Sequence, residues 1–85
     1  MSVTAAEVAE KAVSWAEAAE VALTQVEEYR KQTKYAEGAR EMEAARQARM
    51  MAEGFEEYRV RAVDMATMWS GVAGALQVTK AGGPA

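Results

Sequence analysis

Apolar residues in the first half of the chain recur at the spacing of an α-helix. They are separated alternately by four and three positions, giving the series Val8, Ala12, Trp15, Ala19, Ala22, Val26 and Tyr29. This heptad spacing places the series along one side of a helix. Thr4 and Glu7 form a capping box in front of it, because the Thr4 hydroxyl can accept a hydrogen bond from the Glu7 amide. We therefore expect a lead-in at residues 1–3 and a first helix over residues 4–33.

A second series with the same spacing covers most of the second half. Its members are Ala44, Ala48, Met51, Phe55, Tyr58, Ala62, Met65, Trp69, Val72 and Leu76. The series predicts a second helix over residues 39–79. Residues 80–85 contain two glycines and the single proline of the chain, and we expect them to form a flexible tail.

The two series are out of phase, which indicates a break between them. Continued by the same steps, the first series passes through Thr33 and Ala36 and then reaches the charged Arg40. Three cations precede Gly38, as is typical of a helix C-terminus with a glycine cap. We expect a turn at residues 34–38, and hence an all-α antiparallel two-helix hairpin. One nearly continuous helix is the alternative, since a glycine inside a helix costs only about 1 kcal/mol.

The composition favours helices, but a two-helix hairpin of this size would be only marginally stable alone. Twenty alanines stand against two leucines and no isoleucine in 85 residues, and most other residue types present are good helix formers. A hairpin of this size buries one stripe of each helix, which barely offsets its conformational entropy. We therefore expect the hairpin to be completed by oligomerisation or by docking on a larger protein, with a homo-oligomer as the first expectation.

The large apolar side chains on the two series are more than one partner helix can cover. They form the expected protein interface, together with a glycine in a small-xxx-small pattern that allows close approach of a second backbone. The interface residues are Trp15, Tyr29, Phe55, Tyr58, Met65, Met68, Trp69, Gly71, Val72 and Leu76. Two alternatives remain: the aromatic residues form the hairpin's own core, and Gly71 ends the second helix.

No enzymatic chemistry is expected from this composition. The chain has no Cys and no His, which excludes thiol nucleophiles, imidazole acid–base catalysis and Cys/His zinc sites. Phosphate-binding and nucleophile-elbow motifs are also missing from the sequence. We therefore expect no catalytic, cofactor-binding or metal-binding residues.

The charge distribution argues against a nucleic-acid partner. The net charge is −3, and six cations near the expected turn are interspersed with acidic residues. These cations are Arg30, Lys31, Lys34, Arg40, Arg46 and Arg49. Phosphate binding by this basic tip is the alternative to a solvated face.

No targeting or membrane-spanning segment is expected. The N-terminal residues lack the positive and apolar regions of a signal peptide, so we expect the chain to be cytoplasmic as synthesised. The longest uncharged run, residues 65–79, is shorter than the roughly 20 apolar residues that span a bilayer.

Residues 69–76, Trp-Ser-Gly-Val-Ala-Gly-Ala-Leu, resemble the W-x-G signature of the WXG100 family. The resemblance covers these eight residues and implies a small secreted helical hairpin with W-x-G at its turn. In this chain the motif lies far beyond the middle, and no tyrosine is followed four residues later by an acid, as in the family's secretion motif.

Together these patterns predict a non-enzymatic subunit that buries apolar helix faces against copies of itself or a larger complex. The alanine-rich composition suits an accessory structural protein of a large particle, such as a phage virion or a secretion machine. A WXG100-like secreted protein and a regulatory or chaperone-like binder of one partner protein are the alternatives.

Overall fold

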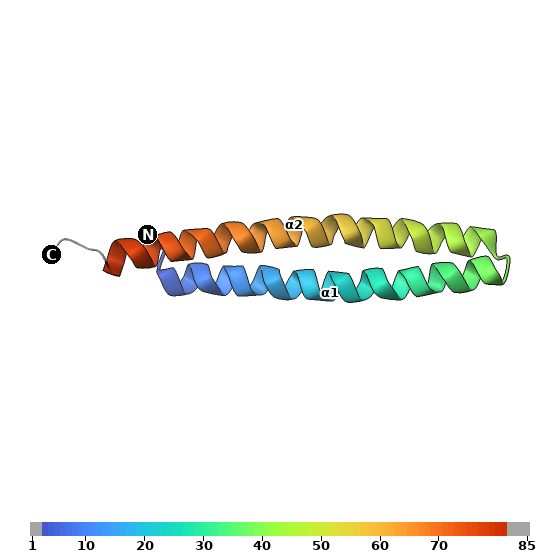
Figure 1. The fold of residues 1–85 in the computed structure, drawn as a ribbon, viewed down its shortest axis with the longest axis horizontal. Coiled ribbons are helices and arrows are strands. Elements are labelled where there is room, and N and C mark those ends of the chain that lie inside the picture. Colours follow the sequence, from blue (N-terminus) through green and yellow to red (C-terminus); the bar gives the residue numbers. More distant parts are fainter. Residues whose placement is uncertain (1–2, 82–85) are drawn as a thin grey trace.

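The computed structural model describes residues 3–81, and the side chains of residues 3–76. Helix α1, Ala5–Gly38, and helix α2, Met42–Ala81, lie side by side in antiparallel directions and form a hairpin (Figure 1). The molecule measures 69 × 20 × 13 Å. The predicted all-α two-helix hairpin is thus confirmed. Within residues 3–81, neither helix contains a segment long and apolar enough to cross a membrane.

Helix α1 begins at the expected cap. Thr4 has an extended backbone, with φ −80° and ψ 157°, and its hydroxyl accepts a hydrogen bond from the Glu7 amide at 3.1 Å. The Thr4 carbonyl accepts from the Val8 amide, which starts the helical hydrogen-bond series. Residues 1–2 of the expected lead-in, like residues 82–85 of the expected tail, lie outside the described residues.

The turn lies later than the sequence predicted. It comprises residues 39–41, so the expected first-helix end at residue 33, turn at 34–38 and second-helix start at 39 are wrong. Helix α1 continues because Ala36 still packs against α2 and is buried. Gly38 remains helical, and Arg40 adopts the left-handed conformation with φ 60°. The Glu41 amide donates to the Ala36 carbonyl at 2.8 Å and closes the turn.

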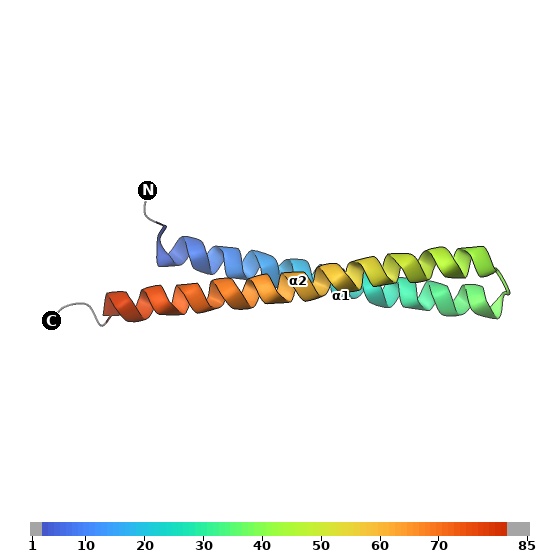
Figure 2. The same cartoon turned by 90° about the horizontal axis from the view of Figure 1, so that it is seen from above.

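The other expected boundaries are also revised. The turn reverses the chain direction, which rules out the continuous helix. Helix α2 runs to Ala81, two residues beyond the expected end at 79 and into the expected tail. The C-terminal end of α2 projects past the start of α1, and the helices cross near mid-length (Figure 2).

The core between the helices is made almost entirely of alanine. Among residues 3–76 the buried apolar residues are nine alanines and two valines: Val8, Ala12, Ala19, Ala22, Val26, Ala36, Ala45, Ala48, Ala52, Ala62 and Ala73. On α1 this is the predicted series, with Trp15 and Tyr29 half-buried within it. Such small side chains leave little apolar volume between the helices.

On α2 the buried series differs from the predicted one at every second position. Ala45, Ala52 and Ala73 are buried, whereas the predicted Ala44, Met51 and Val72 are exposed. Both series contain Ala48, Phe55, Ala62 and Trp69. The alanines face α1 because small side chains allow closer helix packing, which leaves the larger neighbouring side chains at the edge of the contact.

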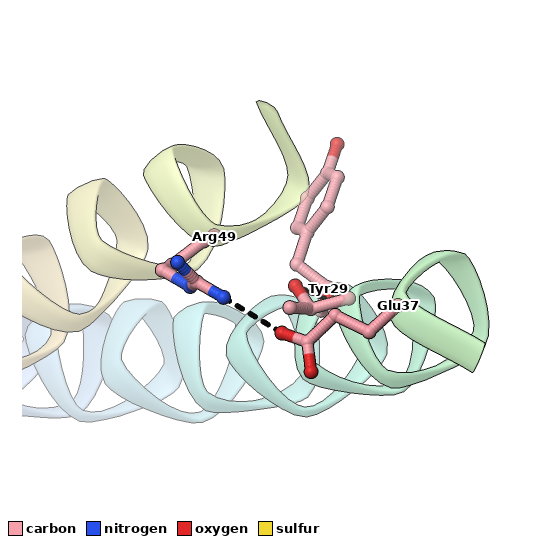
Figure 3. Close-up of polar contacts among 4 residues, drawn as sticks. Tyr29, Glu37 and Arg49 are labelled. Atoms are coloured by element: carbon pink, nitrogen blue, oxygen red, sulfur yellow. Dashed lines mark hydrogen bonds and ion pairs between the residues drawn. The ribbon is translucent and has the colours of Figure 1, made fainter. Parts of the chain in front are cut away.

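Three contacts across the hairpin fix how the helices are aligned. The Arg49 guanidinium donates to Glu37 at 2.7 Å beside the turn (Figure 3). Further along, the rings of Tyr29 and Phe55 stack with their centroids 5.8 Å apart. Near the open end, the Lys11 ammonium lies 4.8 Å from the centre of the Trp69 ring.

Candidate protein-interaction surfaces

The hairpin exposes more surface than a compact protein of the same size. Its accessible surface is 6478 Å², whereas a compact monomer of 9.2 kDa exposes about 4,900 Å². Its radius of gyration is 19.2 Å, against about 12 Å for a compact chain of this length. The excess of about 1,500 Å² reflects the elongated shape, in which each helix is covered by the other on one side only.

One edge of α2 carries a continuous row of large apolar side chains. We call this row the methionine stripe: Met51, Tyr58, Met65, Met68 and Val72. Four of its members follow one another at intervals of seven residues, so they lie on the same side of the helix. Met51, Tyr58 and Met68 are 46%, 44% and 47% exposed, and Met65 is half-buried. These side chains extend the apolar surface of α2 outside its contact with α1.

Polar and small residues interrupt the stripe at only a few positions. Gly54 lies between Met51 and Tyr58, and a Cβ atom added there would meet no heavy atom within 4 Å. A shallow groove follows this glycine and is lined by Met50, Met51, Phe55 and Tyr58. Methionine-rich surfaces of this kind adapt readily to a partner because the side chain is flexible and polarizable.

A second apolar patch lies on the opposite edge of the hairpin. A shallow groove crosses from Ala16 and Leu23 of α1 to Val63 and Ala66 of α2. Leu23 and Val63 are each 42% exposed. Arg59 borders this patch, so it is shorter and more polar at one end than the methionine stripe.

Arg59 and Glu56 form an ion pair along α2. The Arg59 Nε donates to a Glu56 carboxylate oxygen at 3.0 Å, and Nη2 donates to the other oxygen. This hydrogen bonding lowers the pKa of Glu56 below its ordinary value and raises the pKa of Arg59. The pair is arranged along one helix, and therefore stabilises α2 rather than a binding site.

The basic tip is a surface of mixed charge. A shallow groove near the turn brings Arg30, Lys34 and Arg49 together with four carboxylates. Those carboxylates belong to Glu37, Glu53, Glu56 and Glu57. Arg49 already pairs with Glu37, so its charge is partly neutralised within the hairpin. Alternating charges of this kind are typical of a solvated face.

The structure divides the ten predicted interface residues into two groups. Four aromatic residues lie half-buried along the helix–helix contact: Trp15, Tyr29, Phe55 and Trp69. Met65 is half-buried in the methionine stripe, and the remaining five are exposed on α2: Tyr58, Met68, Gly71, Val72 and Leu76. The first group belongs in part to the hairpin's own packing, whereas the second is open to a partner.

The structure corrects one alternative for Gly71 and adds surface residues that the predicted interface omitted. Helix α2 continues through Gly71, so this glycine does not end the helix. Met50 and Met51 join the exposed surface, as do Leu23 and Val63 on the opposite edge. The seven-residue spacing of Met51 with Tyr58 was the signal for including Met51, which belongs to the predicted series but was left out of the expected interface.

The W-x-G tripeptide lies within α2, far from the turn at residues 39–41. This position differs from the one that the WXG100 resemblance implies. Within the described part of the chain, no group of three or more acidic residues could hold a metal ion. Comparison with protein-family models, curated proteins and solved structures finds no match to this chain.

Proposed function

We propose that this protein is a non-enzymatic assembly subunit. It acts by burying apolar helix faces against copies of itself or against one face of a larger complex. The observation that carries the proposal is the exposed apolar surface along α2, which the hairpin has no further element to cover. We place such a subunit in a large protein particle, for example a phage virion or a secretion machine, because its composition is rich in alanine.

Two features support assembly over a solitary existence. The fully buried side chains of the hairpin are alanines and valines, which contribute less transfer free energy than larger apolar residues. The larger apolar side chains remain half-buried or exposed. Association would remove these side chains from water and add the stabilisation that the thin core lacks.

Sedimentation of the purified chain over a concentration series of about 1–500 µM tests the proposal. We expect particles larger than the 9.2 kDa chain, and a melting temperature that rises with protein concentration. A monomer at every concentration, with a cooperative and concentration-independent melt, would contradict assembly. Retention on DNA that weakens with salt would favour the basic tip as the functional surface instead.

A further inference from the structure

We infer that the methionine stripe pairs α2 with α2 of a second copy of this chain, in antiparallel orientation. This inference rests on the proposed assembly function and specifies its surface, partner and geometry. A two-fold axis perpendicular to the helices, passing between Arg61 and Asp64, relates the two hairpins. The result is a four-helix assembly with one turn at each end.

The available surface matches what a stable dimer needs. A standard protein interface covers about 800 Å² on each partner. The hairpin exposes about 1,500 Å² more than a compact monomer of its mass. One further hairpin docked on the stripe would therefore cover about half of this excess and leave the opposite edge free.

Helix α2, rather than α1, forms the centre of the pairing. On the side of the hairpin that carries the stripe, α1 presents mainly polar residues at the positions flanking its buried series. These are Lys11, Gln25 and Gln32, with Ala18 among them. The stripe on α2 contains a single charged position, Arg61, over the same length. An apolar partner face is therefore offered by α2 of a second copy.

Charge complementarity selects the antiparallel orientation. Arg61 lies at the middle of the stripe, and Glu57 and Asp64 border it on the outer side of α2. None of the three makes an ion pair among the described residues, whose ion pairs are Glu37–Arg49 and Glu56–Arg59. An antiparallel pairing centred between Arg61 and Asp64 places each Arg61 at the level of Asp64 of the second copy, and each Asp64 at the level of Arg61. A parallel pairing would instead place Arg61 beside Arg61 and acid beside acid.

Gly54 supplies a recess in the same surface. Space beside its backbone is open, and the antiparallel pairing brings the far half of the second copy's stripe to this level. An apolar side chain such as Met68 or Val72 of the second copy can occupy this recess. The stripe therefore has both projecting apolar side chains and a recess at Gly54 that can receive a side chain of the second copy.

Two glutamate substitutions test which edge of the hairpin forms the dimer contact. They introduce the same charge at native residues of similar exposure. Met68→Glu places a carboxylate in the stripe, and Val63→Glu places one on the opposite edge; both native residues are exposed. We expect Met68→Glu to raise the dimer dissociation constant by about 100-fold and Val63→Glu by less than about 3-fold. Far-ultraviolet circular dichroism at high concentration checks that both variants remain helical.

The outcomes distinguish this inference from the proposed function. If Val63→Glu disrupts association and Met68→Glu does not, the stripe is wrong but assembly stands. If both variants associate like the wild type, the stripe is likewise wrong. If the wild type itself is a monomer at every concentration, the assembly function fails, and the inference with it.

Spin labels test the orientation, because the chain has no native cysteine to compete for the label. Val60→Cys and Arg46→Cys place labels on the same outer face of α2, near its middle and near the turn. In the antiparallel dimer we expect distances of about 30 Å for Val60→Cys, mainly across the dimer, and about 55 Å for Arg46→Cys, where the 1.5 Å rise per residue adds an offset along the helices. Similar short distances for both labels would show a parallel arrangement and overturn the inference.

Discussion

Tyr29 of α1 stacks on Phe55 of α2, with ring centroids 5.8 Å apart and ring planes inclined by only 13°. Both rings are half-buried at the contact between the helices. The neighbouring core positions are alanines and a valine, so this stack is the largest apolar contact in its part of the hairpin. It joins residues that are distant in sequence and therefore helps to align the two helices.

A double-mutant cycle measures what the stack contributes. We expect Phe55→Ala to lower the free energy of unfolding by about 2 kcal/mol, less than for a fully buried phenylalanine. The coupling between Phe55→Ala and Tyr29→Ala should be about 1 kcal/mol, measured by urea unfolding at one fixed protein concentration. Tyr35→Ala is the control, because Tyr35 is 78% exposed and should change stability by less than about 0.5 kcal/mol. Additive effects of the two substitutions would contradict the role of the stack.

The alanine core should tolerate enlargement poorly. Ala62 is fully buried between the helices, and Ala62→Leu should therefore force them apart. We expect a loss of about 1–3 kcal/mol in the free energy of unfolding, measured by urea denaturation. Ala44→Leu on the exposed surface of the same helix serves as the matched control, with an expected change within about 0.5 kcal/mol. Equal effects of the two substitutions would show that the helices are not closely packed at Ala62.

Glycine in place of Arg40 should stabilise the turn. The left-handed conformation at φ 60° is disfavoured for arginine but open to glycine. Arg40→Gly is expected to stabilise the hairpin by about 0.5–1 kcal/mol and to raise the melting temperature by a few degrees. Arg46→Gly, inside α2, should instead cost about 1 kcal/mol. The turn conformation would be contradicted if both substitutions lowered the melting temperature equally.

The ion pair between Glu56 and Arg59 predicts a dependence of stability on pH. Because the hydrogen bonds from Arg59 lower the pKa of Glu56, the carboxylate's contribution is complete above the ordinary glutamate pKa. This contribution is lost as the pH falls through the lowered pKa. We expect Glu56→Gln to flatten the decline in melting temperature between about pH 5 and pH 3. Glu10→Gln, at an exposed position outside the two ion pairs, should leave a steeper decline than Glu56→Gln does.

The sequence predicted the fold class and the buried side of α1, but it misassigned half of the buried series of α2. Two series with equal spacing pass through Ala48, Phe55 and Ala62, and the sequence analysis chose the one with larger side chains. Ranking by hydrophobicity favours Met51 over Ala52, whereas close approach of two helices favours the alanine. Four members of the predicted series, Met51, Tyr58, Met65 and Val72, therefore lie in the methionine stripe beside the buried alanines rather than at the centre of the helix contact.

The position of the turn was readable in part. The α1 series continues through Thr33 and Ala36 before it reaches Arg40, and the structure keeps both residues in the contact with α2. Gly38 and the cations before it indicated an earlier end. The left-handed residue is instead Arg40, a type that gives no sequence signal for this conformation. Which apolar residues of α2 lie exposed beside the contact with α1 could not be predicted fully, because that depends on how α2 is rotated about its axis.

The three residues that connect α1 to α2 also bear on the order of events during folding. A short loop keeps the two halves at high effective concentration, so closure of the hairpin is a fast, unimolecular step. In the proposed assembly, protein concentration enters only afterwards, when closed hairpins encounter one another. Each newly made chain would therefore bury its core alanines within its own hairpin before it associates with other copies.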